Sequence, residues 1–352
     1  MMEFQLPIQL SPIPQPIRYQ DKILLTGSCF TEHIGGALRD WKFEILQNPN
    51  GILFDPASVA SSLISYINTR PCKEEDLVFF NELWQSWQHH SLFSHTDKTA
   101  CLRLINESRA KAHAFLKEAN WLIITLGSSF SYRLVPEVPD FLQNAPARTA
   151  ATAGIPYPVA NCHRAPAPSF QKHLMTIEEI NTALDNCLYQ LFLFNPKIRV
   201  IFTVSPVRHV RDGVIENNRS KARLLESVHH LVNKFDRISY FPAYELVIDV
   251  LRDYRFYDID MVHPNYQATS FVLEKFTRFF IDEPSQQLME ELKKIVIARK
   301  HRPFQPTTRA HKKFLLDHWE KTVALKARYP FLDLEDEIAY FSSATDDRAA
   351  AP

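Results

Sequence analysis

The sequence predicts an α/β fold, a three-layer, flavodoxin-like arrangement in which helices cover both faces of a parallel sheet. The first observation is that short, nearly continuous apolar runs alternate with longer segments of helical periodicity. Strands of that kind are buried on both faces. The second is that the residues with the most distinctive chemistry follow the first and the last runs. Open parallel sheets carry their sites beyond the carboxyl ends of the strands.

Each predicted strand is a short apolar run, and about five such runs are expected in one sheet. They lie at residues 23–25, 42–47, 121–126, 198–204 and 238–242. The predicted helices are the segments in which apolar residues recur every three or four positions. They lie at about residues 31–40, 56–68, 99–119, 176–194, 218–236 and 265–282.

Two insertions interrupt this alternation within one large domain, residues 1–282. Residues 77–98 are dense in aromatic residues and histidine, which favours a hairpin or lid over the site. Residues 131–170 are rich in proline and alanine with few strand or helix signals, which favours a long functional loop. Beyond the domain, a charged helical pattern predicts a helical appendage at 283–340, which packs on the core or mediates self-association. A disordered tail is expected at 341–352.

The composition excludes several classes of protein. Lys+Arg and Asp+Glu both number 40, so no basic excess indicates nucleic acid or an anionic membrane as a partner. The first 20 residues contain four prolines and no apolar core of a signal peptide. No apolar window approaches the roughly 18 residues of a membrane span. The five cysteines are odd in number and form no CxxC pair, which favours free thiols and a cytoplasmic location.

The segment KILLTGSCFTEHIG, at residues 22–35, has the outline of a strand, a glycine turn and a helix start. Ser28 would then lie at the carboxyl edge of the sheet, near a helix N-terminus that favours developing negative charge. Taken alone, the segment favours a simpler interpretation, in which Ser28 is a helix N-cap beside a turn glycine. The functional interpretation depends on a second segment, far downstream.

That segment is YDIDMVHPN, in which Asp260 precedes His263 by three residues. On one tight loop, the carboxylate can accept the Nδ1–H of the imidazole and leave Nε2 free to take a proton from a serine. Pro264 favours a helix start directly after the histidine. An early serine on a strand-to-helix turn and a late Asp-x-x-His together indicate a serine hydrolase.

These segments resemble the SGNH (GDSL-type) hydrolase superfamily, and more closely its GSCFA branch, which is named for the string around the serine. Here that string runs from Gly27 to Thr31, with threonine in place of the final alanine. Further blocks follow in the order of the family. They are NPNGILFDP at 48–56, TLGSS at 125–129, VANCHR at 159–164, SPVRH at 205–209 and DIDMVHPN at 258–265.

The resemblance implies a catalytic triad of Ser28 as nucleophile, His263 as general base and then acid, and Asp260 as the residue that orients His263. It also implies an oxyanion hole made of the backbone N–H groups of Ser28 and Gly51 and a side-chain amide. In the superfamily that amide comes from a Gly-x-Asn-Asp block, whereas this chain has Gly127-Ser128-Ser129-Phe130.

Three possibilities remain for the missing donor: Ser129 donates, Asn161 moves into the site, or the oxyanion hole is incomplete. An incomplete hole costs about 10²–10³ in turnover. Substrate-binding residues are expected at Gly127, His89, His90 and His209. The spacing of His89, His90 and His95 matches no zinc pattern, so neither a metal nor another cofactor is expected.

The expected function is a serine esterase that hydrolyses a small acyl ester, with O-acetyl groups of a carbohydrate or glycan as candidates. An O-acyltransferase with the same triad and a catalytically weak binding or scaffold protein remain alternatives. Cys29 is an alternative nucleophile, because a thiolate near a helix N-terminus can have a lowered pKa. No nucleic acid or membrane partner is expected, and the C-terminal helices are the candidates for homo-oligomer contacts.

Overall fold

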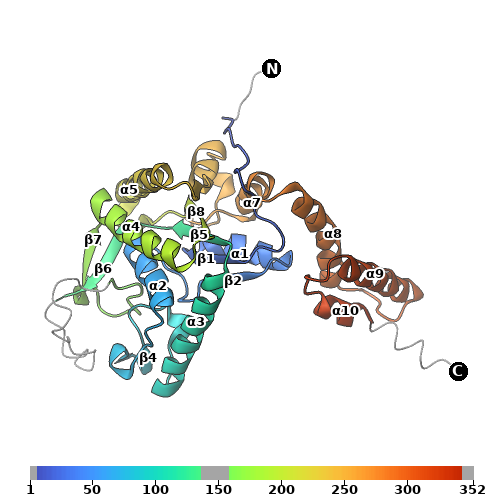
Figure 1. The fold of residues 1–352 in the computed structure, drawn as a ribbon, viewed down its shortest axis with the longest axis horizontal. Helices are drawn as coiled ribbons and strands as arrows, with labels where there is room; N and C mark the ends of the chain where they lie inside the picture. Colours follow the sequence, from blue (N-terminus) through green and yellow to red (C-terminus); the bar gives the residue numbers. More distant parts are fainter. Residues whose placement is uncertain (1–5, 136–157, 343–352) are drawn as a thin grey trace. The chain divides into compact units, whose positions relative to one another are not determined.

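The computed structural model describes residues 6–135 and 158–342 and contains a five-stranded sheet with helices packed around it (Figure 1). The strands are β1 (Ile23–Gly27), β2 (Ile45–Gln47), β5 (Trp121–Leu126), β8 (Arg199–Val204) and β9 (Ile238–Tyr240). Their order is β2-β1-β5-β8-β9, and β1, β5, β8 and β9 pair in parallel. This is the flavodoxin-like order, so the predicted fold class is confirmed.

Helices surround the sheet, and both of its faces are buried. Leu24 and Ile124 on one face share a hydrophobic core with four helices, α2 to α5. Ile23 and Ile123 on the opposite face are at most 1 % exposed. The helices are α1 (Phe30–Asp40), α2 (Pro56–Asn68), α3 (Lys98–Glu118), α4 (Ile177–Phe194), α5 (Gly213–Lys234), α6 (Ala243–Glu245) and α7 (Tyr266–Phe280).

The predicted boundaries of β5 and α2 coincide with the observed ones. Two predicted strands are shorter in the structure. Strand β2 begins only at Ile45, because Lys42 has a left-handed backbone with a φ of 64°. Strand β9 ends at Tyr240, since Pro242 has no N–H to offer a ladder.

The first insertion contains the expected hairpin. Strands β3 (Val78–Phe80) and β4 (Leu83–Gln85) are antiparallel. Asn81 and Glu82 between them both have positive φ, as a tight two-residue turn requires.

The second insertion was predicted to carry few strand signals, and that prediction is wrong at both of its ends. Strands β6 (Phe130–Leu134) and β7 (Phe170–Leu174) form an antiparallel pair there. Most of their residues are only partly buried, so the alternation of apolar residues that marks a strand is weak. Residues 136–157, the centre of the predicted loop, lie outside the described residues.

The chain divides into two compact units. The first includes Lys22–Gly35 and Leu46–Lys275 and therefore nearly the whole sheet. The second combines Ser11–Asp21 and Gly36–Ile45 with the chain from Phe276 onward.

The second unit contains the C-terminal helices α8 (Glu283–Lys300), α9 (Arg309–Arg328) and α10 (Glu335–Ser342), as predicted. Glu337 of α10 is buried and forms ion pairs with Lys42 and Arg299 at 2.8 and 2.6 Å. None of the described helices is long and apolar enough to cross a membrane. The tail predicted to be disordered lies, beyond Ser342, outside the described residues.

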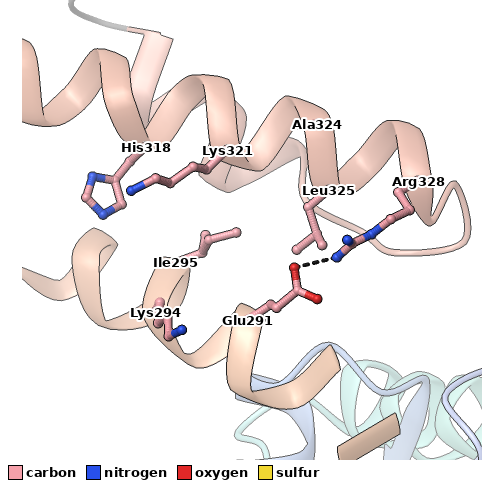
Figure 2. A pocket seen from close by; sticks show the side chains of 8 residues that line it. All are labelled: Glu291, Lys294, Ile295, His318, Lys321, Ala324, Leu325 and Arg328. Atoms are coloured by element: carbon pink, nitrogen blue, oxygen red, sulfur yellow. Dashed lines mark hydrogen bonds and ion pairs between the residues drawn. The ribbon is translucent and has the colours of Figure 1, made fainter. Parts of the chain in front are cut away.

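A cleft of about 550 Å³ opens between α8 and α9 (Figure 2). Glu291 and Arg328 form an ion pair at one side of it, and His318 and Lys321 project from α9. None of the residues predicted to form the active site lines this cleft. The chemistry has to be sought at the edge of the sheet. The lining residues are Glu291, Lys294, Ile295, His318, Lys321, Ala324, Leu325 and Arg328.

Candidate active site

The turn between β1 and α1 holds Ser28 at the carboxyl edge of the sheet. Gly27 ends β1 with a φ of +139°, and a Cβ there would lie 2.1 Å from the carbonyl oxygen of Thr125, so only glycine fits. The N–H of Ser28 donates to the same oxygen at 3.0 Å. Ser28 is 1 % exposed, and its Oγ has no hydrogen-bond partner among the described residues. The backbone of the predicted nucleophile is fixed, while its hydroxyl is uncommitted.

The loop after β2 places Gly51 beside this turn. Asn48 Oδ1 accepts from the N–H of Gly27 at 3.0 Å, and the N–H of Leu53 donates to the Gly27 carbonyl at 2.9 Å. The N–H of Gly51 donates to the carbonyl of Asn48 at 2.7 Å. Both backbone donors expected for an oxyanion hole, those of Ser28 and Gly51, are therefore engaged within the protein.

Gly127, directly after β5, leaves only a small space next to Ser28, in which even a methyl group would be crowded. A Cβ on Gly127 would lie 3.2 Å from Ser28 Cβ and from Phe54 Cδ1, and 3.4 Å from Nε2 of His209. This Nε2 is also buried without a hydrogen-bond partner in the described part of the chain. Burial, together with the charges of Lys221 and His263, lowers the pKa of His209 to about 4. A neutral imidazole and an uncommitted hydroxyl therefore border the space that Gly127 leaves.

We expect Gly127→Ala to fill this space and to lower ester turnover by at least about tenfold, because the new methyl group would press on Ser28 and shift it from its place. The backbone of Gly127 is not left-handed, so the fold should tolerate the close contacts at a cost of about 1–3 kcal/mol. Steady-state kinetics and urea unfolding check both statements. Unchanged turnover in a folded variant would contradict the expected role of this space.

Asp260 and His263 form a hydrogen-bonded pair on the loop before α7. His263 Nδ1 donates to Asp260 Oδ2 at 2.6 Å, and the backbone N–H groups of Val262 and His263 donate to Oδ1 at 2.9 and 3.0 Å. These bonds lower the pKa of Asp260 to about 2. The carboxylate is therefore charged and fixes the Nδ1–H tautomer of His263.

His263 lies near the β1–α1 turn without bonding Ser28. Burial lowers the pKa of His33 on α1, and the charge of His263 contributes to that effect. The N–H of Arg208, next to His209, donates to the carbonyl of Val262 at 3.2 Å. The loop of His263 therefore shares one edge of the sheet with Ser28, but the serine–histidine hydrogen bond of a working triad is not made.

The two residues expected to replace the missing amide bond to other groups. Ser129 Oγ donates to the carbonyl and the hydroxyl oxygen of Ser220, both at 3.1 Å. Asn161 Oδ1 accepts from the N–H of His163 at 2.8 Å. The structure thus brings Ser28, Gly127 and His209 together, and it ties Ser129 to α5 instead.

Comparison with protein families covers most of the chain. A model described as the GSCFA family matches residues 22–276, which include the whole candidate site. The chain belongs to the GSCFA family. A second model, described as the C-terminal domain of GSCFA domain protein, matches residues 292–347. No curated protein matches this GSCFA chain significantly.

Two histidines of the first insertion were expected to bind substrate, and they occupy different environments. His89 is 1 % exposed, its Nδ1 bonds the hydroxyl of Ser86 at 3.1 Å, and its ring packs edge-on against Phe93. His90 lies against Gly51, where a Cβ would come within 2.2 Å of the His90 Cβ. Across residues 6–135 and 158–342, no three His, Cys, Asp or Glu side chains are placed to hold a metal ion.

The burial of His89 predicts sensitivity to acid. Burial lowers the pKa of His89 to about 3, whereas an unfolded histidine titrates near about 6.5. Between these values the unfolded chain binds more protons, so stability falls as the pH drops through this window. We expect His89→Asn, which cannot titrate, to lose less stability than wild type between pH values of about 7 and 5. Urea unfolding at both pH values measures the free energy of unfolding of the variant and of wild type. A difference between the two proteins that is the same at both pH values would contradict the prediction.

Sequence reasoning missed Lys221 on α5. Its side chain is 1 % exposed, and Nζ donates to the carbonyl oxygens of Gly127 at 2.6 Å and Ser205 at 2.7 Å. Burial lowers the pKa of Lys221 to about 7, which the neighbouring Cys29 partly offsets. A signal was present in the sequence, since Lys221 shares the helical spacing of the buried Leu224 on the same helix.

Cys29 is only partly buried, unlike Ser28. Burial raises the pKa of its thiol, while the backbone N–H of Phe30 and the charge of Lys221 act in the opposite direction. The turn therefore presents two potential nucleophiles with different access to solvent.

Proposed function

We propose that this GSCFA protein hydrolyses small acyl esters through an acyl-enzyme formed at the β1–α1 turn. The observation that carries the proposal is the 2.6 Å bond between His263 Nδ1 and Asp260 Oδ2, at the sheet edge that also holds Ser28. A histidine oriented by a charged carboxylate is a general base with a defined tautomer. The resemblance of the motifs to SGNH hydrolases supports the same chemistry.

In the proposed reaction, His263 Nε2 takes the proton of the nucleophile as its oxygen attacks the ester carbonyl. The same proton then passes to the departing alcohol, and an acyl-enzyme remains. Water, deprotonated by His263, releases the acid. Ser28 is the nucleophile in this scheme, because it follows β1 at the carboxyl edge of the sheet and its Oγ is free of any hydrogen bond among the described residues. Contact with Nε2 requires the loop of Asp260 and His263 to close on the turn.

Cys29 is the second candidate for the nucleophile, and its partial exposure is the observation that favours it. The Oγ of Ser28 is inaccessible to solvent, so a substrate reaches it only after local movement. A sulfur nucleophile would follow the same steps through a thioester.

Small O-acyl groups on a carbohydrate are the substrate class that we propose. The rings of Phe54 and His209 pack close to Gly127 and Ser28, and such a confined site suits a short acyl chain better than a long one. Neither a metal nor an organic cofactor enters the scheme.

The test is covalent labelling combined with turnover of a short-chain nitrophenyl ester. Purified wild type, Ser28→Ala and Cys29→Ala are treated with a fluorophosphonate and, separately, with iodoacetamide, and mass spectrometry locates each label. We expect fluorophosphonate on Ser28 and loss of turnover in Ser28→Ala. Loss of turnover in Cys29→Ala alone would move the nucleophile to Cys29. A folded wild-type protein that neither labels nor hydrolyses esters would refute the proposed function.

A further inference from the structure

Lys221 is a buried cation without a matching anion. Its Nζ uses two of its three donors on the carbonyl oxygens of Gly127 and Ser205, and no carboxylate lies within ion-pair distance of it among the described residues. Burying an ammonium group in this way costs several kcal/mol that two neutral carbonyl groups offset only in part. Such a cost at the end of two central strands calls for a function.

The surroundings of Lys221 connect it to the candidate nucleophiles. Gly127, whose carbonyl it binds, is the glycine next to Ser28. The charge of Lys221 also influences the pKa values of Cys29 on the β1–α1 turn and of His209 after β8. The ring of Tyr244 lies 6.0 Å from Nζ. Through Gly127, Lys221 therefore adjoins the turn at which a reacting oxygen or sulfur would become negative.

Lys221 also contacts the block that begins at Gly127, in which the chain lacks the side-chain amide of the superfamily. Ser128 and Ser129 follow Gly127, and both bond to Ser220, the residue before Lys221. Helix α5 therefore contacts this block through two neighbouring residues. Ser220 bonds both serines, and Lys221 bonds the carbonyl group of Gly127. When Lys221 is protonated, its charge in this low-dielectric site would stabilise an anion without reorganisation during the reaction.

We propose that Lys221 is a positioning residue that holds Gly127 in place and stabilises, through its buried positive charge, the anion that develops at the Ser28–Cys29 turn. This inference rests on the proposed function for its effect on turnover. Its effect on Cys29 is independent of any substrate, since a nearby positive charge favours the thiolate over the thiol. The other charged group that acts on Cys29 is Glu32 of α1, which opposes Lys221.

The experiment compares Lys221→Met, Lys221→Gln and a matched control, Lys234→Met. Lys234 lies on the same helix and pairs at the surface with Asp185. Glutamine keeps a neutral donor for the Gly127 carbonyl, and methionine keeps only the shape. Circular dichroism establishes folding, and Lys221→Gln carries the test if the methionine variant does not fold. The first readout is the rate of iodoacetamide reaction at Cys29 against pH, measured by mass spectrometry; the second is ester turnover.

We expect both Lys221 variants to move the Cys29 reaction midpoint to higher pH and to lower ester turnover by about tenfold or more, while Lys234→Met changes neither. An unchanged midpoint in a folded Lys221 variant would overturn the inference, and so would wild-type behaviour of Lys221→Gln, since the carbonyl bond alone would then suffice. If wild type hydrolyses no ester, the proposed function fails and the Cys29 profile still decides the role of Lys221.

Discussion

Replacing His263 by alanine is expected to lower ester turnover by at least about 10³-fold, because His263 carries out both proton transfers of the proposed reaction. Both side chains of the Asp260–His263 pair are almost half exposed, at 45 % and 47 %. Truncation therefore leaves no cavity, and the folded state should lose little stability. Stopped-time ester assays and thermal unfolding of the same preparation check the two halves of the prediction.

Asp260→Asn is the matched variant for this prediction. Asp260 Oδ1 accepts two backbone N–H groups, so the single oxygen of asparagine will stay there and its NH₂ will face His263 Nδ1. The proton then moves to Nε2, which can no longer act as a base, and a loss of about 10⁴-fold is expected. Near-wild-type turnover in either variant would mean that His263 is not the base.

Gly27→Ala is expected to destabilise the fold by more than about 4 kcal/mol, enough to prevent recovery of soluble protein. The new Cβ would lie 2.1 Å from the oxygen, 2.8 Å from the carbon and 2.9 Å from the nitrogen of Thr125. All three atoms belong to the backbone of a central strand, so no side chain can move to relieve the contact. The φ of +139° adds strain for any residue with a side chain.

Gly36→Ala is the control for that substitution. Gly36 lies within α1, and a Cβ there meets no atom within 4 Å. Alanine in a helix is favoured over glycine by about 0.5–1 kcal/mol, so this variant should be slightly more stable than wild type. Chemical unfolding of both proteins distinguishes a steric requirement at Gly27 from a general sensitivity to glycine replacement.

The architecture of the sheet could be predicted because its strands are buried on both faces. A run such as residues 121–126 is buried at every position and apolar at all but Thr125, which is the pattern of a strand covered on both faces. The β6–β7 pair could not be predicted in the same way. Its strands are short and half-exposed, and their pairing depends on residues far apart in the sequence, such as Phe130 and Leu174, rather than on a local pattern.

The same distinction between local and long-range contacts applies to the candidate site. The Asp260–His263 pair could be predicted because one short turn contains both partners. The bonding of Ser129 could not, since its partner Ser220 lies 91 residues further along the chain. The burial of Lys221 was missed for another reason. Lysine is almost never fully buried. The charge of Lys221 therefore argued for an exposed side chain, although the residue lies on the apolar stripe of α5.

The exposed turn of Asp260 and His263 has a consequence for how this protein responds to heat. The turn is held mainly by its own hydrogen bonds, such as that from the N–H of Asp258 to the carbonyl of His263 at 2.8 Å. Ile259 within it is 99 % exposed, so little apolar surface opposes its opening. Segments of this kind open at lower free energy than the core. Warming should therefore abolish the proposed ester turnover reversibly, several degrees before the sheet melts, and cooling should restore it.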